Sequence, residues 1–230
     1  MPWETSADAA GKSLTIPGRF VYLPVGMRKQ ATQPAPASSA REAIRTAAIK
    51  LFAEEGYAAT TTREICAQAG VTKPVLYYHY GSKEQLFHGL MLDAHNEFLK
   101  EVMRASHRGK TVREKFIEVL AADFALNRRD PGLSMILFRM VFAAEKGSPE
   151  LNVVAFGIDW LRVLVGIARD GVRQRELHGK PQEIAEALMG VHTLYTMSFL
   201  VTGQPKLDRA LATRIVDLLL RGCGSRATDR

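Results

Sequence analysis

Charged, aromatic and hydroxyl side chains are concentrated in one stretch of this sequence, TTREICAQAGVTKPVLYYHYGSK, which covers residues 61–83. Arg63, Lys73 and Lys83 each fall at a predicted helix start, where a positive side chain adds to the positive end of the helix dipole and favours phosphate. Two adjacent tyrosines, Tyr77 and Tyr78, follow in the second short helix. These residue types at this spacing indicate contact with a nucleic acid backbone and with base edges.

The elements that must position these side chains are two short helices joined by a tight turn. Three pairs of residues have the pattern of helix starts: Thr61 with Glu64, Thr72 with Pro74, and Ser82 with Gln85. Gly70 follows the first short helix and can adopt the left-handed conformation that such a turn needs. Ile65 and Leu76, together with Ala69 and Val71, are spaced to pack the two helices together. The stretch is therefore predicted to be a helix-turn-helix that presents the start of its second helix to the major groove.

The run TTREICAQAGVTKPVLYYHYGSKEQL resembles the DNA-binding domain of the TetR (tetracycline repressor) family of transcriptional regulators. The typical family pattern has alanine where this sequence has Cys66, and phenylalanine where it has Tyr80. Neither difference is expected to disturb DNA binding. The resemblance implies an all-α fold in which three N-terminal helices bind DNA and the remaining helices bind a ligand and form a dimer.

Carried over residue by residue, the resemblance also implies a set of DNA contacts. Residues at the start of the first motif helix are expected to contact phosphate and occasionally a base, the first half of the second helix is expected to read base edges, and its end is expected to hold phosphates. The implied DNA-binding residues are Thr61, Thr62, Arg63, Thr72, Lys73, Pro74, Val75, Tyr77, Tyr78, His79 and Lys83. Core packing is the alternative for Tyr77 and Tyr78, but two adjacent helical residues cannot both face inward.

Composition is typical of a folded globular protein, with 230 residues, 47% hydrophobic and 24% charged. The formal net charge is +7, yet residues 39–90 hold six Lys or Arg against five Asp or Glu. The placement of the basic side chains therefore supports DNA binding better than the net charge does. No clear signal peptide or membrane span is recognised, which predicts a cytoplasmic protein.

Helical periodicity continues to the end of the chain, with breakers at DPG, KGSP, HGKP and TGQP. Helices are predicted at residues 40–55, at the two short segments, and at 83–106, 112–127, 133–146, 150–176, 182–202 and 208–222, about nine in all. We expect a disordered arm at 1–38, a DNA-binding domain at 39–85, a ligand-binding and dimerisation domain at 86–222, and a flexible tail at 223–230. For the arm, three interpretations remain: an inert tail, a minor-groove contact by Arg28 and Lys29, or a true start at Met27.

Two sets of residues in the C-terminal half are candidates for a ligand pocket and a dimer interface. The pocket set is rich in methionine and aromatic residues and contains Met135, Phe138, Arg139, Phe142, Trp160, His192, Tyr195 and Thr196. Ordinary core packing is the alternative for each of them, and surface pairing for Arg139. The interface set lies on the last two helices, whose wide apolar faces predict a four-helix bundle between two copies: Leu188, Val191, Ser198, Leu211, Ile215 and Leu218.

Enzyme chemistry is not indicated, because the six histidines form no HExxH motif and the chain has no nucleophile elbow or glycine-rich phosphate loop. Two cysteines in unrelated segments support neither a disulfide framework nor a metal site. We expect no cofactor. The predicted function is a dimeric regulator, most simply a repressor, that a small and largely apolar molecule releases from a palindromic operator. The alternative is an activator or architectural DNA-binding protein without a ligand.

Overall fold

The computed structural model describes residues 40–142 and 147–221, and within these ranges all regular structure is helical. The helices are α1 (Ala40–Glu55), α2 (Thr62–Ala69), α3 (Lys73–Tyr80), α4 (Lys83–Ser106), α5 (Val112–Arg129), α6 (Pro131–Phe142), α7 (Val153–Arg173), α8 (Pro181–Thr202) and α9 (Arg209–Arg221). The predicted all-α fold is confirmed. The expected arm at 1–38, with its basic residues, and the tail at 223–230 lie outside the described residues.

Local sequence signals start the helices where they were predicted, with small shifts. Thr61 and Glu64 form a complete capping box, in which the Glu64 carboxylate accepts from the Thr61 amide at 2.8 Å. Ser82 accepts from the Gln85 amide at 3.0 Å. Thr72 precedes α3 as expected, but its side chain makes no capping hydrogen bond. Gly70 closes α2 with φ of +67°, the left-handed conformation that the turn requires.

Helix starts in the C-terminal half differ from the prediction by up to three residues, and two of the differences occur at proline. Helix α6 begins at Pro131 rather than at residue 133, and α8 begins at Pro181 rather than at 182. Proline suits the first turn of a helix because the amide that it lacks would have no partner there. Helix α7 begins at Val153 rather than at 150, because Asn152 caps it by accepting from the Ala155 amide at 3.1 Å.

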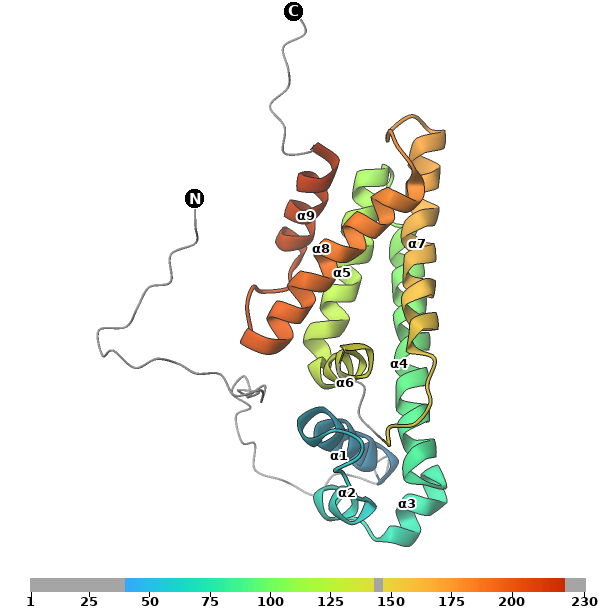
Figure 1. The fold of residues 1–230 in the computed structure, drawn as a ribbon, viewed down its shortest axis with the longest axis vertical. Coiled ribbons are helices and arrows are strands. Elements are labelled where there is room, and N and C mark those ends of the chain that lie inside the picture. Colours follow the sequence, from blue (N-terminus) through green and yellow to red (C-terminus); the bar gives the residue numbers. More distant parts are fainter. Residues whose placement is uncertain (1–39, 143–146, 222–230) are drawn as a thin grey trace, which may run out of the picture.

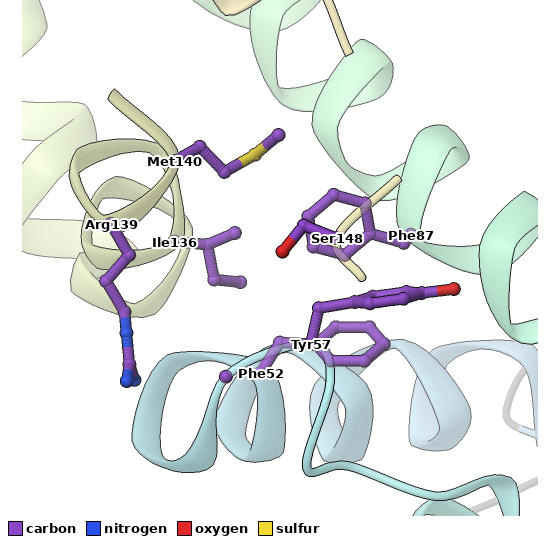
Figure 2. Close-up of a pocket in the computed structure, with 8 residues that line it drawn as sticks. Phe52, Tyr57, Phe87, Ile136, Arg139, Met140 and Ser148 are labelled. Atoms are coloured by element: carbon purple, nitrogen blue, oxygen red, sulfur yellow. The ribbon is translucent and has the colours of Figure 1, made fainter. Parts of the chain in front are cut away.

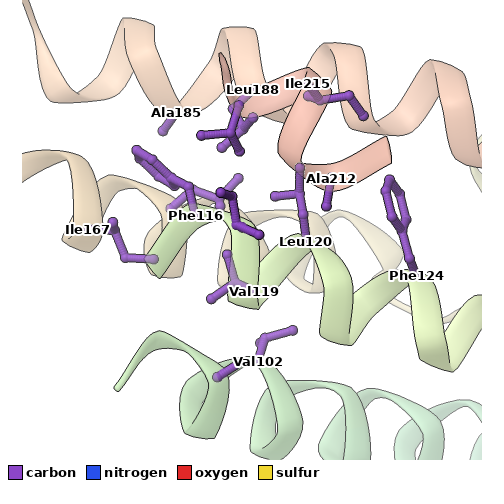
Figure 3. Close-up of a cluster of buried hydrophobic side chains, with 14 of the residues drawn as sticks. Val102, Phe116, Val119, Leu120, Phe124, Ile167, Ala185, Leu188, Ala212 and Ile215 are labelled. Carbon is purple, nitrogen blue, oxygen red and sulfur yellow. The ribbon is translucent and has the colours of Figure 1, made fainter. Parts of the chain in front are cut away.

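Buried apolar side chains form two separate cores. The first joins α1, α2 and α3 to the beginning of α4 and to α6, and is centred on Ile44, Phe52, Ile65, Leu76 and Phe87. The second lies among α4, α5, α7, α8 and α9, as Figure 3 shows, and is built around Phe116, Leu120, Phe124, Leu164 and Leu188. The first core therefore extends beyond residue 85, into two helices that follow the motif.

Helices α4 and α6 connect the two cores. Helix α4 runs along one side of the molecule (Figure 1), with Leu86 and Leu90 in the first core and Val102 in the second. Helix α6 packs on α1, and its second residue, Gly132, comes so close that an added Cβ would lie 2.8 Å from Cγ2 of Ile49. These two helices provide the physical link between the N-terminal helices and the rest of the chain.

Candidate nucleic-acid interface and ligand pocket

Helix α3 of the helix-turn-helix has one buried residue and a largely exposed remainder. Leu76 is fully buried in the first core and fixes the helix, whereas Lys73, Pro74 and Tyr77 are exposed. Tyr78 is 85% exposed, which is exceptional for an aromatic side chain in a packed protein. Of the other predicted DNA-binding residues in the motif, Thr61, Arg63 and Thr72 are exposed, and Thr62, Val75 and His79 are half-buried. The prediction that these residues contact DNA is compatible with this exposure and remains a prediction.

Lys83 has partners within the chain, and this changes its interpretation. Its ammonium group donates to the carbonyl of Tyr57 and to the carbonyl of Thr60, each at 2.8 Å. Burial lowers the pKa of Lys83, and the nearby Glu64 carboxylate partly opposes this effect. Two of its three protons are thus engaged in closing the loop between α1 and α2. We therefore remove Lys83 from the proposed phosphate contacts and treat it as a structural residue.

Tyr80, which takes the place of the phenylalanine typical of the family pattern, uses its additional oxygen. The Tyr80 hydroxyl donates to the carbonyl of Arg41 at 3.0 Å, and burial raises the pKa of this phenol. The hydrogen bond ties the end of α3 to the first turn of α1. It orients the recognition helix relative to the rest of the N-terminal unit.

The predicted pocket residues separate into different environments. Trp160, His192 and Thr196 are buried together between α7 and α8, with Tyr195 half-buried beside them. Met135 and Phe138 are half-buried on α6, and Phe142 is 62% exposed at its end. Only part of the set can therefore line one site.

Arg139 is the member of the pocket set that the structure places elsewhere. Its guanidinium donates to the carbonyl of Ala53 at 2.9 Å and to that of Glu54 at 3.3 Å, both in the last turn of α1. In Figure 2 its side chain extends from α6 toward α1. The expectation that Arg139 pairs with a ligand in the same pocket as Trp160 is wrong, because the carbonyl groups at the C-terminal end of α1 attract this cation.

A small cavity lies next to Arg139, at the junction of α1, α4 and α6 (Figure 2). Its volume is about 20 Å³, and its walls include Phe52, Tyr57, Phe87, Ile136 and Met140. A space of this size accommodates about one water molecule and is far below the several hundred Å³ of a typical ligand pocket. This cavity is not the predicted ligand pocket.

The sequence interpretation missed two polar partners inside the C-terminal core. Asp123 and Asn127 of α5 are buried, and the Asn127 amide donates to the Asp123 carboxylate at 2.9 Å. The same carboxylate oxygen makes a short hydrogen bond with Nε2 of His192. The sequence did hold a signal for this pair. Asp123 and Asn127 are four residues apart on the helix face that also carries Phe116 and Leu120, which places two polar side chains in a core.

Three of the six predicted interface residues face inward. Leu188, Leu211 and Ile215 are buried in the second core of a single chain, so the prediction that they lie at a dimer interface is wrong. Their helical spacing indicated an apolar face but could not distinguish an internal core from an external contact. Val191 and Ser198 are half-buried, and Leu218 is 53% exposed.

An uncharged stripe on the outer face of α8 was not recognised from the sequence. Ala187, Gly190, Leu194 and Val201 recur at intervals of three, four and seven residues and are all exposed. Leu194 is 66% exposed. By length and composition alone α8 could cross a membrane. Only 28% of its most apolar stretch is buried within the described chain, so most of this stretch is left for another molecule to cover. A second copy of the chain covering this face would explain the same composition.

Within the described ranges, no group of three or more His, Cys, Asp or Glu side chains is arranged to hold a metal ion. Cys66 is buried in α2, and burial raises the pKa of its thiol. Its environment is that of a small apolar side chain of the first core.

Comparison with known families gives a match over the N-terminal helices. Residues 44–90 match the family model described as "Bacterial regulatory proteins, tetR family". These residues begin within α1 and end within α4, so they contain the complete helix-turn-helix and the buried residues that hold it.

Full-length relatives and solved structures extend the likeness to the other helices. The fatty acid metabolism regulator protein of Bacillus subtilis (strain 168) is 24% identical over 182 residues, covering 78% of this chain and 93% of that protein. A regulatory protein of the tetR family from Rhodococcus RHA1 superposes with a TM-score of 0.66 at 24% identity, covering 81% and 98% of the two chains. The transcriptional regulator FadR from Bacillus subtilis, solved in complex with stearoyl-CoA, gives a TM-score of 0.65 at 20% identity, with coverage of 80% and 99%.

Proposed function

We propose that this chain is a tetR-family regulator, as the match of residues 44–90 to that family model indicates, and that it acts as a dimeric, cytoplasmic repressor that binds a palindromic operator. The single observation that carries this proposal is the exposed start of α3, where Lys73, Pro74 and Tyr77 face outward around the buried anchor Leu76. Lysine can reach guanine in the major groove, and the apolar groups of proline and valine can touch a thymine methyl group.

The dimer is proposed to form through the exposed stripe of α8, together with Leu218 of α9. An interface around one twofold axis uses the same surface patch of both copies, so an uncharged helix face, which brings no like charges together, suits it well. Two recognition helices related by this axis would read half-sites about 34 Å apart, or a multiple of that distance. The operator is therefore expected to be palindromic.

Release from DNA is proposed to follow binding of a largely apolar effector to the C-terminal helices. The likeness to a fatty acid metabolism regulator and to a FadR structure that holds stearoyl-CoA favours an effector with a hydrocarbon chain. Such a ligand must bind the DNA-incompetent arrangement more tightly than the competent one, because equal affinity for both would shift nothing. Helices α4 and α6 contact both cores and would carry the change to the N-terminal helices.

The test is selection of bound sequences from a random DNA pool by the purified full-length protein at two salt concentrations. A palindrome enriched at both concentrations, with affinity that falls as salt increases, is the expected result. Failure to enrich any sequence, with protein shown to be dimeric and free of bound lipid, would contradict the proposal. The enriched operator then serves to find the effector, which should release the protein from it.

A further inference from the structure

Two buried nitrogen atoms between α7 and α8 have no hydrogen-bond partner among the described residues: Nε1 of Trp160 and Nδ1 of His192. Each of these residues is only 6% exposed. A buried polar atom without a partner costs about 1 to 3 kcal/mol, so nearly all such atoms in folded proteins are paired. Two of them in one place indicate that the site is made for a group that the chain itself does not supply.

The partners of His192 determine what kind of group would fit. Its Nε2 faces the Asp123 carboxylate, and the Thr196 hydroxyl lies 3.4 Å from the same nitrogen. Because a carboxylate only accepts hydrogen bonds, we assign a proton to Nε2, and in the tautomer that carries only this proton Nδ1 is an acceptor. Trp160 Nε1 is always a donor. The site therefore offers one donor and one acceptor.

The two rings that carry these nitrogen atoms are neighbours and are packed against aromatic side chains. The ring centres of Trp160 and His192 are 5.8 Å apart, at an angle of 67° between the rings. The ring centres of Phe124 and His192 are 5.3 Å apart in a stacked pair, and those of Phe98 and Trp160 are also 5.3 Å apart in a T-shaped pair. Trp160 belongs to the second hydrophobic core, whose buried members are apolar side chains.

Helix α6 carries apolar side chains that are not packed into either of the two cores. Its residues Met135 and Phe138 are half-buried and belong to neither of the two core clusters, although α6 contacts both α7 and α8. A hydrocarbon chain lying between α6 and these helices would cover both side chains. Its polar end would then meet the Trp160 and His192 pair.

We propose that Trp160 and His192 bind the O–H head group of an otherwise apolar effector, either an alcohol or a protonated carboxylic acid. The oxygen accepts from Nε1 of Trp160, and the O–H donates to Nδ1 of His192. The proposal rests on the proposed function, since it takes the C-terminal helices to be the effector-binding unit. It adds the chemical class of the head group and the two residues that recognise it.

The experiment uses three probes of equal chain length: 1-decanol, decanoic acid and 1-chlorodecane, which has no O–H group. Binding is measured for the wild-type protein and for Trp160→Phe, which keeps an aromatic ring but removes the N–H donor. Trp3→Phe is the matched control, because it makes the same change at the only other tryptophan of the chain. It also leaves Trp160 as the single fluorescent reporter.

At least one of the two O–H probes should bind wild-type protein and Trp3→Phe about tenfold more tightly than 1-chlorodecane, the contribution of one well-made hydrogen bond. Trp160→Phe should lose this preference. Equal affinity for all three probes, or an unchanged preference in Trp160→Phe, would overturn the proposal. Comparison of decanol with decanoic acid identifies the head group. If Trp160→Phe does not fold, the fluorescence emission of Trp160 in the Trp3→Phe variant tests the proposal instead. This emission should change when an O–H probe is added and should not change with 1-chlorodecane.

Failure of this proposal is distinguishable from failure of the proposed function. A protein that selects a palindrome but shows no head-group preference remains a DNA-binding regulator with a different effector site. A protein that binds an O–H probe through Trp160 but selects no DNA has the effector site without the regulatory role.

Discussion

The ammonium group of Lys83 lies 4.0 Å from the centre of the Tyr57 ring and also donates to the Tyr57 carbonyl. Through this contact and its second hydrogen bond, to Thr60, the first residue of α4 closes the loop that leads from α1 into α2. Tyr57 in turn packs against Phe52 and Phe87 in the first core. A cation at the start of α4 thus holds the helix-turn-helix together from within.

Substitution Lys83→Met should lower stability, with little direct effect on DNA contacts. It removes two hydrogen bonds from a charged donor and a cation–π contact, which together should cost about 2 kcal/mol at this partly exposed site. Urea denaturation measures the loss. Lys100→Met, at an exposed position of the same helix, is the control and should change stability by less than about 0.5 kcal/mol. Unchanged stability with reduced DNA affinity would return Lys83 to the phosphate contacts.

Substitution Lys73→Ala should weaken operator binding without unfolding the protein, because this side chain is exposed at the start of α3. For a lysine that contacts a phosphate, the slope of log affinity against log salt should fall by about 1. If it reads guanine instead, discrimination at one base pair should fall by about 1 to 3 kcal/mol. Lys100→Ala serves as control. The assigned role would be refuted if the dimeric Lys73→Ala variant kept the operator affinity, the salt dependence and the base specificity of the wild-type protein.

Substitution Leu194→Glu should convert the proposed dimer into monomers, since it would bury a charge from each copy in the apolar interface formed by the α8 stripe. Light scattering after size-exclusion chromatography measures the mass. Leu92→Glu, at a position on α4 that is 45% exposed, is the matched control and should leave the dimer intact. A dimeric Leu194→Glu protein would show that the interface lies elsewhere.

Substitution Gly132→Ala should destabilise the contact between α6 and α1 by about 1 to 3 kcal/mol, the usual cost of overpacking. The methyl group would meet Cγ2 of Ile49 at 2.8 Å, and Ile49 is a buried, β-branched residue with little freedom to move. Gly166→Ala is the control, because nothing lies within 4 Å of its added methyl group in α7. There, better helix propensity should stabilise the protein by up to about 1 kcal/mol. Thermal denaturation that ranks the two variants in the opposite order would contradict this view of the interface.

Substitution Glu114→Gln should reduce stability at neutral pH and change its dependence on acid. Hydrogen bonds from the backbone amides of Lys110 and Thr111 lower the pKa of Glu114 below its ordinary value of 4.5. A depressed pKa in the folded state stabilises the protein above about pH 4.5, and this contribution disappears as the pH falls through the folded value. The difference between wild type and variant should therefore be present at pH 7 and vanish in acid.

Denaturation curves between pH 3 and pH 7 follow this difference for Glu114→Gln. Glu55→Gln, which changes an exposed carboxylate at the end of α1, provides the comparison. A stability difference between wild type and Glu114→Gln that stays constant across this range would show that the cap acts without its charge.

Sequence alone determined the helices and the helix-turn-helix. Capping at Thr61, the turn at Gly70 and the spacing of Ile65 and Leu76 act over a few residues, so their consequences can be read directly from neighbouring positions. The helical spacing that places Leu76 inside also predicted that the other residues at the start of α3 are exposed. The family resemblance, carried by contiguous residues, was confirmed for the same reason.

Tertiary structure alone decided which apolar face is core and what each polar side chain in the interior meets. Leu188 and Leu194 belong to one apolar helix, and only the positions of the helices packed on α8, which include α5, α7 and α9, make the first buried and the second exposed. Lys83 and Arg139 proved to hold backbone carbonyl groups that lie 23 and 86 residues away along the chain. The unpaired nitrogen atoms of Trp160 and His192 likewise became visible only once three helices had met. Such contacts depend on the relative placement of distant segments, which local periodicity does not encode.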